Sequence, residues 1–187
     1  YCGERCPAIE QSGKMEMLEE ILAEIDRCGG GKSLIFTQYV EMGNLIVKLL
    51  GEKMQAPIEF LHGALNRVKR DEMVENFQHN SLGRILIVSL KAGGTGLNLT
   101  AANNVIHYDL WWNPAVEVQA TDRAYRIGQT KDVDVYRLIT EGTFEEKIDE
   151  MLRCKKDLAN LTVNSGESWI TEMSNAQLRD LVTLSQA

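Results

Sequence analysis

The sequence predicts an α/β fold, with a mainly parallel sheet covered by helices on both faces. Short apolar runs alternate along the chain with segments of helical periodicity. Strands that are separated by helices are usually parallel and joined by right-handed crossovers. The run SLIFT, at 33–37, follows a glycine cluster and is typical of a buried strand.

The elements follow one another regularly through the first three quarters of the chain. Leu18, Ile21, Leu22 and Ile25 recur at i, i+3, i+4 and i+7, which predicts an amphipathic helix from Lys14 to about Cys28. We expect strands at 33–37, 58–61, 84–89, 104–109 and 133–139, and helices at 44–50, around 73–77 and from Pro114 to about Ile127.

The last part of the sequence contains helix signals and no strand signal. Thr143-x-x-Glu146 and Ser174-x-x-Gln177 are capping-box patterns, each of which opens a helix. We therefore expect two units, a sheet domain with a lead-in helix at 1–140 and a helical brace or tail at 141–187.

Composition limits the function classes. The 187 residues suffice for one domain and a tail, and 44% hydrophobic with 25% charged residues is ordinary for a globular protein. A net charge of −7 argues against strong nucleic-acid binding by this piece alone. No apolar run could span a bilayer, so we expect no membrane partner. Cys2 and Cys6 have no second pair at ligand spacing, so we expect no metal site. The start at Tyr1, without Met, suggests a fragment of a longer chain.

The stretch GGGKS at 29–33 has the look of a phosphate-binding loop. Such a loop needs an earlier glycine where this chain has Asp26, and it must follow a strand and open a helix. Here a helix precedes and a strand follows. We interpret Gly29 to Gly31 as a helix C-cap and Lys32 as the start of a strand.

The strongest functional pattern is QATDRAYRIGQ, from Gln119 to Gln129. On a helix, Gln119, Asp122, Arg123 and Arg126 occupy i, i+3, i+4 and i+7 and share one face. Two arginines one turn apart repel unless an anion lies opposite, so the pattern favours a polyphosphate site. A salt-bridged surface helix is the alternative.

Two further stretches each follow a predicted strand. SLKAGGTGLNL contains Gly93, Gly94 and Gly96, which allow a close backbone approach to a ligand, although a plain tight turn would look the same. DLWWNP ends another strand, and its adjacent Trp111 and Trp112 cannot both face inward, so one indole is free to stack on a ligand.

Together these stretches resemble the second RecA-like motor lobe of the Swi/Snf-related, superfamily-two DNA-dependent ATPases. GGTGLNL, the WNP of DLWWNP and QATDRAYRIGQ match helicase motifs V and VI in order, and SGKMEMLEEIL, SLIFTQY and LHGALNRVKRDEMVENF match other landmarks. The resemblance covers about Cys6 to Leu152. Tyr125 departs from the family, which more often has His there, and Gln129 stands where DEAD-box RNA helicases have Arg.

The resemblance implies a role for each motif. Arg123 and Arg126 would be arginine fingers, with Gln119 as the third catalytic residue, and Gly94, Gly96 and Asp122 would lie at the nucleotide. Gln38, Lys91 and Trp112 would contact DNA. ATP with Mg would be bound mainly by the first lobe, which is absent from this chain, so the isolated lobe should not hydrolyse ATP. The partners implied are that N-terminal lobe and double-stranded DNA.

Two alternatives stay open on the sequence alone, namely a lobe of an RNA helicase and a catalytically silent α/β interaction module. A self-contained ATPase using GGGKS would require turnover by the isolated chain. The compact motif spacing resembles bacterial members of the family, so we expect a cytoplasmic, nucleoid-associated protein, or a nuclear one if it is eukaryotic.

Overall fold

The computed structural model describes residues 12–56, 58–80, 83–93, 96–111, 113–126 and 128–159, together with Ser174 and Arg179. Five parallel strands form one sheet in the order β2-β3-β1-β4-β5, which confirms the predicted fold class. The strands are β1 (Ser33–Thr37), β2 (Glu59–Leu61), β3 (Ile85–Ser89), β4 (Asn104–His107) and β5 (Asp134–Arg137). All five lie within predicted runs.

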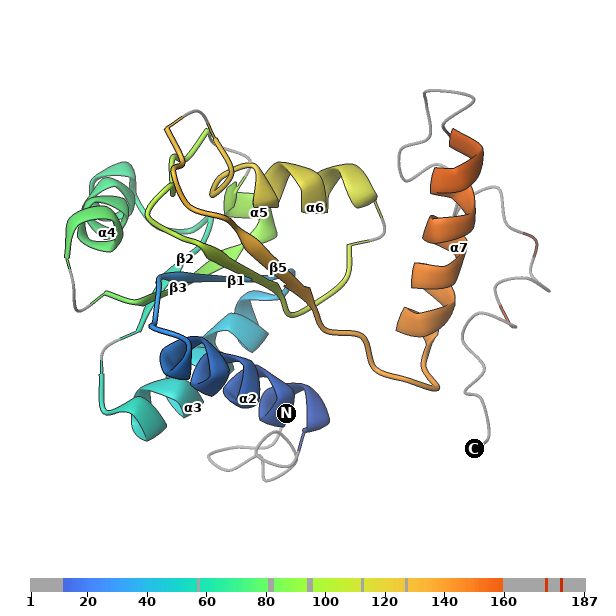
Figure 1. The fold of residues 1–187 in the computed structure, drawn as a ribbon, viewed down its shortest axis with the longest axis horizontal. Helices are drawn as coiled ribbons and strands as arrows, with labels where there is room; N and C mark the ends of the chain where they lie inside the picture. The colour runs from blue at the N-terminus through green and yellow to red at the C-terminus, as the bar shows by residue number, and fades with distance from the viewer. Residues whose placement is uncertain are drawn as a thin grey trace.

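Helices cover both faces of the sheet (Figure 1). On one face lie α2 (Gly13–Arg27) and α3 (Val40–Met54), and on the other lie α4 (Arg67–His79), the short α5 (Leu90–Gly93) and α6 (Pro114–Thr121). The helix α7 (Phe144–Ala159) stands beyond the end of β5, to one side of the sheet. No described helix is long and apolar enough to cross a membrane.

The strand pleat divides the core into two clusters. Ile35, Ile87 and Ile106 point toward α2 and α3, where they pack against residues such as Leu18 and Ile46. The intervening residues face α4 to α6, and this second cluster includes Leu34, Phe36, Leu86, Val88, Phe77 and Ala120. Because the three central strands are fully buried, their apolar runs are continuous rather than alternating.

The stretch GGGKS ends a helix and precedes a strand, as predicted. The backbone N–H of Gly30 donates to the Ile25 carbonyl at 2.9 Å, the longer bond of a Schellman cap. The strand occupies Ser33–Thr37, as expected, and Lys32 lies directly before it.

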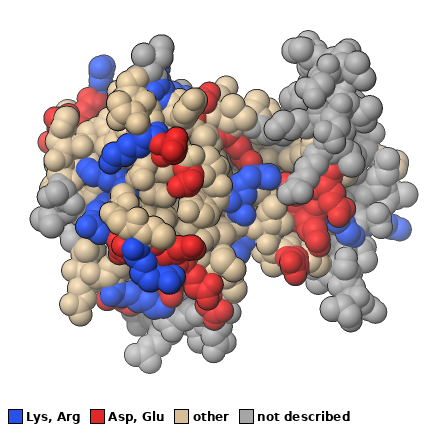
Figure 2. Space-filling view, in the orientation of Figure 1, with Lys and Arg blue, Asp and Glu red and all other residues tan. Residues whose placement is uncertain are grey.

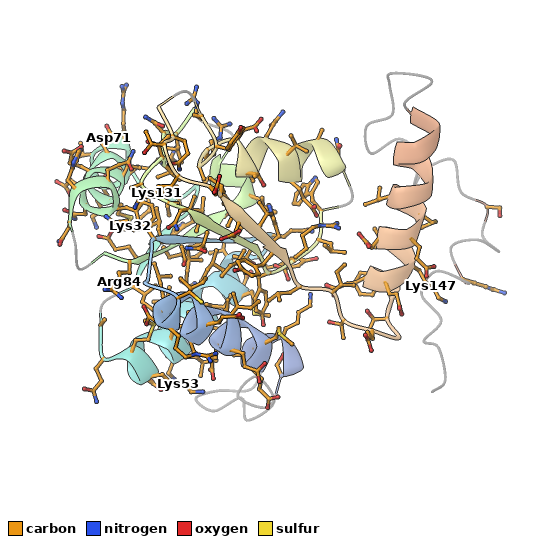
Figure 3. All side chains as sticks on the ribbon, viewed as in Figure 1. Lys32, Lys53, Asp71, Arg84, Lys131 and Lys147 are labelled. Atoms are coloured by element: carbon orange, nitrogen blue, oxygen red, sulfur yellow. The ribbon has the colours of Figure 1, made fainter. Side chains whose placement is uncertain are left out.

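Lys32 has a larger role than starting a strand. Its ammonium group donates to the carbonyl oxygens of Phe77, of Gln78 at 3.4 Å and of Asn80 at 2.8 Å, at the end of α4. It also lies 5.3 Å from the centre of the Phe77 ring. Lys32 therefore caps the negative end of a helix, and Figure 3 labels it close to α4. A lysine occupied in this way is not available to a phosphate.

The expected start of the tail helix is confirmed, with a small shift in its capping bonds. The hydroxyl of Thr143 accepts from the Glu145 N–H at 3.3 Å, and the Glu146 carboxylate accepts from the Gly142 N–H at 2.9 Å. These bonds satisfy N–H groups at the start of α7. The second tail helix, expected to open at Ser174, lies outside the described residues except for Ser174 and Arg179.

Candidate functional site

An open hollow of about 430 Å³ lies at the end of α6. It is lined by Gln119, Asp122, Arg123, Tyr125 and Arg126, all from QATDRAYRIGQ. The helix that leads to it is well defined at its start, because Pro114 occupies the first turn and the Asn113 side chain accepts the Ala115 N–H at 3.0 Å.

The prediction that this helix continues to Ile127 is wrong, because α6 ends at Thr121. Beyond it the N–H groups of Arg123 and Ala124 donate to the carbonyls of Ala120 and Thr121, three residues back, so the chain tightens into turns. The common helical face expected for Arg123 and Arg126 therefore does not exist. Their side chains reach the same hollow through these turns instead.

Both arginines lack a carboxylate partner within the described part of the chain. No ion pair joins Asp122 or any other described acid to either guanidinium group. Arg123 is half-buried, and its Nε is a buried donor without a hydrogen-bond partner among the described residues. Arg126 is exposed and makes one long contact, 3.5 Å from Nη1 to the Leu97 carbonyl.

The hollow contains two guanidinium groups that form no ion pair with a described carboxylate. A phosphate would accept from both guanidinium groups. The arrangement therefore favours a polyphosphate site over the alternative interpretation, a salt-bridged surface helix.

Gln129 holds the arginine loop in place, a role that sequence reasoning missed. Its Nε2 lies 3.0 Å from the Thr100 carbonyl, 2.8 Å from that of Ala102 and 3.2 Å from that of Ala124. Its Oε1 accepts from the N–H groups of Thr130 and Lys131. The positive φ of Gly128, 104°, brings the chain back to this position. The only signal in the sequence was the Gly-Gln pair itself.

A second group of polar residues lies where β1 and β4 end, at one edge of the sheet. The Asp109 carboxylate, 9% exposed, accepts from the Thr37 hydroxyl at 2.6 Å and from the Gln38 N–H at 3.1 Å. The Gln38 side-chain amide donates to the Leu110 carbonyl. Gln38 thus spans the two strand ends and positions the start of DLWWNP.

The described residues include only part of the predicted ligand set. Gly94 and Trp112 lie outside them, and for Lys91 the structure describes the backbone, in α5, and not the side chain. Gly96 is exposed, and its φ of 69° favours glycine. Space is not the reason, because an added Cβ would meet nothing within 4 Å. No described cluster of His, Cys, Asp or Glu could hold a metal ion.

His107 is a core residue, and Trp111 packs against the core. His107 is buried, stacks on Phe36 at 5.5 Å between ring centres and contacts the Thr121 hydroxyl at 3.1 Å. Burial, with a smaller contribution from the positive charge of Arg137, lowers the pKa of His107 to about 4. Trp111 is half-buried against the second core cluster.

The surface charge is mixed rather than segregated on the face that Figure 2 shows. Basic and acidic side chains alternate over the sheet domain, so the net charge of −7 does not appear there as one acidic field.

Known proteins are similar to this chain over most of its length. The model of the family described as "Helicase conserved C-terminal domain" matches residues 13–128. A putative ATP-dependent helicase/translocase, YwqA of Bacillus subtilis, is 55% identical over 175 residues, which cover 94% of this chain and 19% of that protein. The chain therefore spans under a fifth of that relative's length.

Two solved structures from Sulfolobus solfataricus are similar over almost the whole chain. The SWI2/SNF2 ATPase C-terminal domain is 40% identical with a TM-score of 0.77, covering 98% of this chain and 73% of that one. The SWI2/SNF2 ATPase core in complex with double-stranded DNA is 45% identical with a TM-score of 0.79, covering 94% and 36%.

Proposed function

Because this chain belongs to the helicase C-terminal domain family, among the C-terminal domains of the SWI2/SNF2 ATPases, we propose that it is the second motor lobe of an ATP-dependent double-stranded DNA translocase. The observation that carries the proposal is the hollow with two guanidinium groups, neither of which forms an ion pair with a described carboxylate, Asp122 included. Such a hollow is suited to the negative charge of a nucleotide that another lobe binds.

In this proposal Arg123 and Arg126 act as arginine fingers. ATP, with Mg, is bound mainly by the first lobe and supplies the phosphoryl group that is transferred to water. When the lobes close, the two guanidinium groups approach the γ-phosphoryl oxygens and stabilise the charge that develops there. Gln119 lines the same hollow and would position the nucleotide or the attacking water. Asp122, Gly94 and Gly96 would lie at the nucleotide.

The DNA contacts come from the edge where the strands end. Gln38 shapes the loop that carries Trp112, and Lys91 follows the end of β3. We propose that Gln38, Lys91 and Trp112 contact the DNA, with Lys91 on a phosphate and Trp112 against a base or sugar. The relative solved with double-stranded DNA supports this choice over RNA.

Turnover measurements separate the proposal from its rivals. This chain alone should show no ATP hydrolysis, whereas the complete protein should hydrolyse ATP and respond to double-stranded DNA more than to RNA. Stronger stimulation by RNA would favour an RNA helicase. Turnover by the chain alone would mean that it contains a complete site, and a complete protein without DNA-dependent turnover would favour a silent module.

We also propose two points of organisation. A boundary near residue 140 separates the motor lobe from the helical brace, and limited proteolysis should cut there first if the units are distinct. We propose a cytoplasmic, nucleoid-associated location, or a nuclear one if the protein is eukaryotic, which fluorescence microscopy of the tagged complete protein would test.

A further inference from the structure

A half-buried ionic cluster joins three elements that the sequence keeps apart. The Arg137 guanidinium, on β5, lies 3.0 Å from the Glu117 carboxylate on α6 and 2.6 Å from the Asp149 carboxylate on α7. The two carboxylates are 10% and 7% exposed, and the arginine is 31% exposed. Although burial lowers the pKa of Arg137, the two neighbouring carboxylates more than offset this, so its pKa is raised.

Glu117 connects this cluster to DLWWNP. One carboxylate oxygen accepts from Arg137, and the other accepts from the Trp111 backbone N–H at 2.9 Å. Trp111 immediately precedes Trp112, the proposed DNA contact, and Glu117 lies on the helix that leads to the arginine hollow. Glu117 therefore contacts the backbone of the proposed DNA loop and lies on the helix that leads to the arginine hollow.

A second ion pair fixes the start of α7. Lys14 of α2 lies 2.5 Å from the Glu145 carboxylate, and its ammonium also donates to the Tyr108 carbonyl at 3.1 Å, just after β4. In the ribbon, α7 stands to one side of the sheet and follows β5 through a short connection (Figure 1). Charged contacts with groups adjoining DLWWNP therefore contribute to the placement of α7, together with its buried Ile148 and Leu152.

We propose that Asp149, Arg137 and Glu117 form a positioning relay, through which helix α7 sets the conformation of the DLWWNP loop and the orientation of α6. The proposal rests on the proposed function for its consequence, because a motor lobe needs its DNA loop and its arginine hollow to respond together. The relay itself is a claim about contacts, and these can be tested without turnover.

Removing one carboxylate changes the relay in a defined way. With Asp149→Asn, Glu117 is the one described carboxylate left at Arg137, so the weaker contact to Asn lets the guanidinium group shift and draw the Glu117 carboxylate away from Trp111. Asp149→Glu restores the charge on a longer stem. Glu150→Gln is the matched control, because Glu150 is an exposed carboxylate on the same helix.

The first test is amide hydrogen exchange at Trp111 in this chain. We expect Asp149→Asn to accelerate exchange at the Trp111 N–H by about 2- to 30-fold, the range typical of coupling residues, while Glu150→Gln leaves it unchanged and Asp149→Glu largely restores it. An unchanged Trp111 amide in Asp149→Asn would overturn the relay, whatever the function of the chain.

The second test uses the complete protein, with basal and DNA-stimulated ATP turnover measured separately. Asp149→Asn should raise the DNA concentration for half-maximal stimulation by about 2- to 30-fold, while Glu150→Gln leaves it unchanged. Faster Trp111 exchange without any change in DNA response would overturn the functional half of the relay. Absence of DNA stimulation in the unmodified protein would instead contradict the proposed function, and the exchange test would still decide the contacts.

Discussion

The side-chain nitrogen of Gln129 lies 2.8 Å from the carbonyl oxygen of Ala102, in the segment that leads into β4. The same nitrogen contacts the carbonyls of Thr100 and Ala124. One side chain therefore ties the loop after α6 to the sheet and fixes the turn on which Arg126 is presented. The hollow depends on this contact as much as on the arginines.

Gln129→Glu should destabilise the chain by about 1–3 kcal/mol, because a carboxylate would face three carbonyl oxygens without a donor between them. Urea unfolding measures this change. Thr130→Ala, an exposed neighbour, is the control and should leave the unfolding free energy within about 0.5 kcal/mol. Equal stability of the two variants would show that Gln129 does not hold the loop.

Lys32→Met should cost about 1–2 kcal/mol of unfolding free energy, since it removes the cation from the end of α4. In the complete protein, the same change should leave ATP turnover unaffected. Lys131→Met, at an exposed lysine labelled in Figure 3, controls for loss of one surface charge. A collapse of turnover in Lys32→Met at unchanged stability would mean that GGGKS binds phosphate after all.

Stability should fall between about pH 6.5 and pH 4 because of His107. Its pKa is about 4 in the folded chain and 6.5 as the ordinary value. Between these values the unfolded state binds a proton that the folded state does not, so stability is retained above pH 6.5 and lost as the pH falls. The loss approaches about 3 kcal/mol.

His107→Gln should flatten this pH dependence in urea unfolding measured across the same interval. His79→Gln, which changes an exposed histidine paired with Glu75, should retain the slope of the unmodified chain. If His107→Gln unfolds with the original slope, the buried imidazole is not the group responsible.

Gly43→Ala should destabilise the chain, although alanine favours helices, because the added Cβ would lie 2.3 Å from the Phe60 ring. Overpacking of this kind costs about 1–3 kcal/mol. Gly51→Ala on the same helix is the matched control, since its Cβ would meet only the Ala56 carbonyl, at 3.6 Å. Gly51→Ala should gain about 0.5–1 kcal/mol, and thermal unfolding of both variants distinguishes packing from propensity.

The sequence was sufficient to predict elements whose burial leaves a periodic pattern. The helix from Lys14 was predictable because Leu18, Leu22 and Ile25 all face the core, and the central strands because both their faces are covered. The glycine cap at 29–31 was predictable from element order. In these cases local sequence preference and tertiary packing agree.

The end of α6 was not predictable in this way. Nothing in TDRAYRI breaks a helix, yet the structure turns at Asp122 because the Arg123 carbonyl accepts from Leu99 and Gln129 fixes the following loop. These partners are distant in sequence, so the periodicity of residues 121–127 does not indicate them. The ionic cluster of Glu117, Arg137 and Asp149 escaped prediction for the same reason.

The proposed function depends on Arg123 and Arg126 acting on a nucleotide held by another lobe. The most direct test is single-turnover ATP hydrolysis by the complete protein with DNA. The rate and the ATP affinity are measured for two separate variants, Arg126→Ala and Arg123→Ala. We expect turnover to fall by about 10³-fold or more with little change in affinity, and Lys131→Ala to behave as the unmodified protein. Arginine variants that hydrolyse ATP at the unmodified rate would contradict the claim.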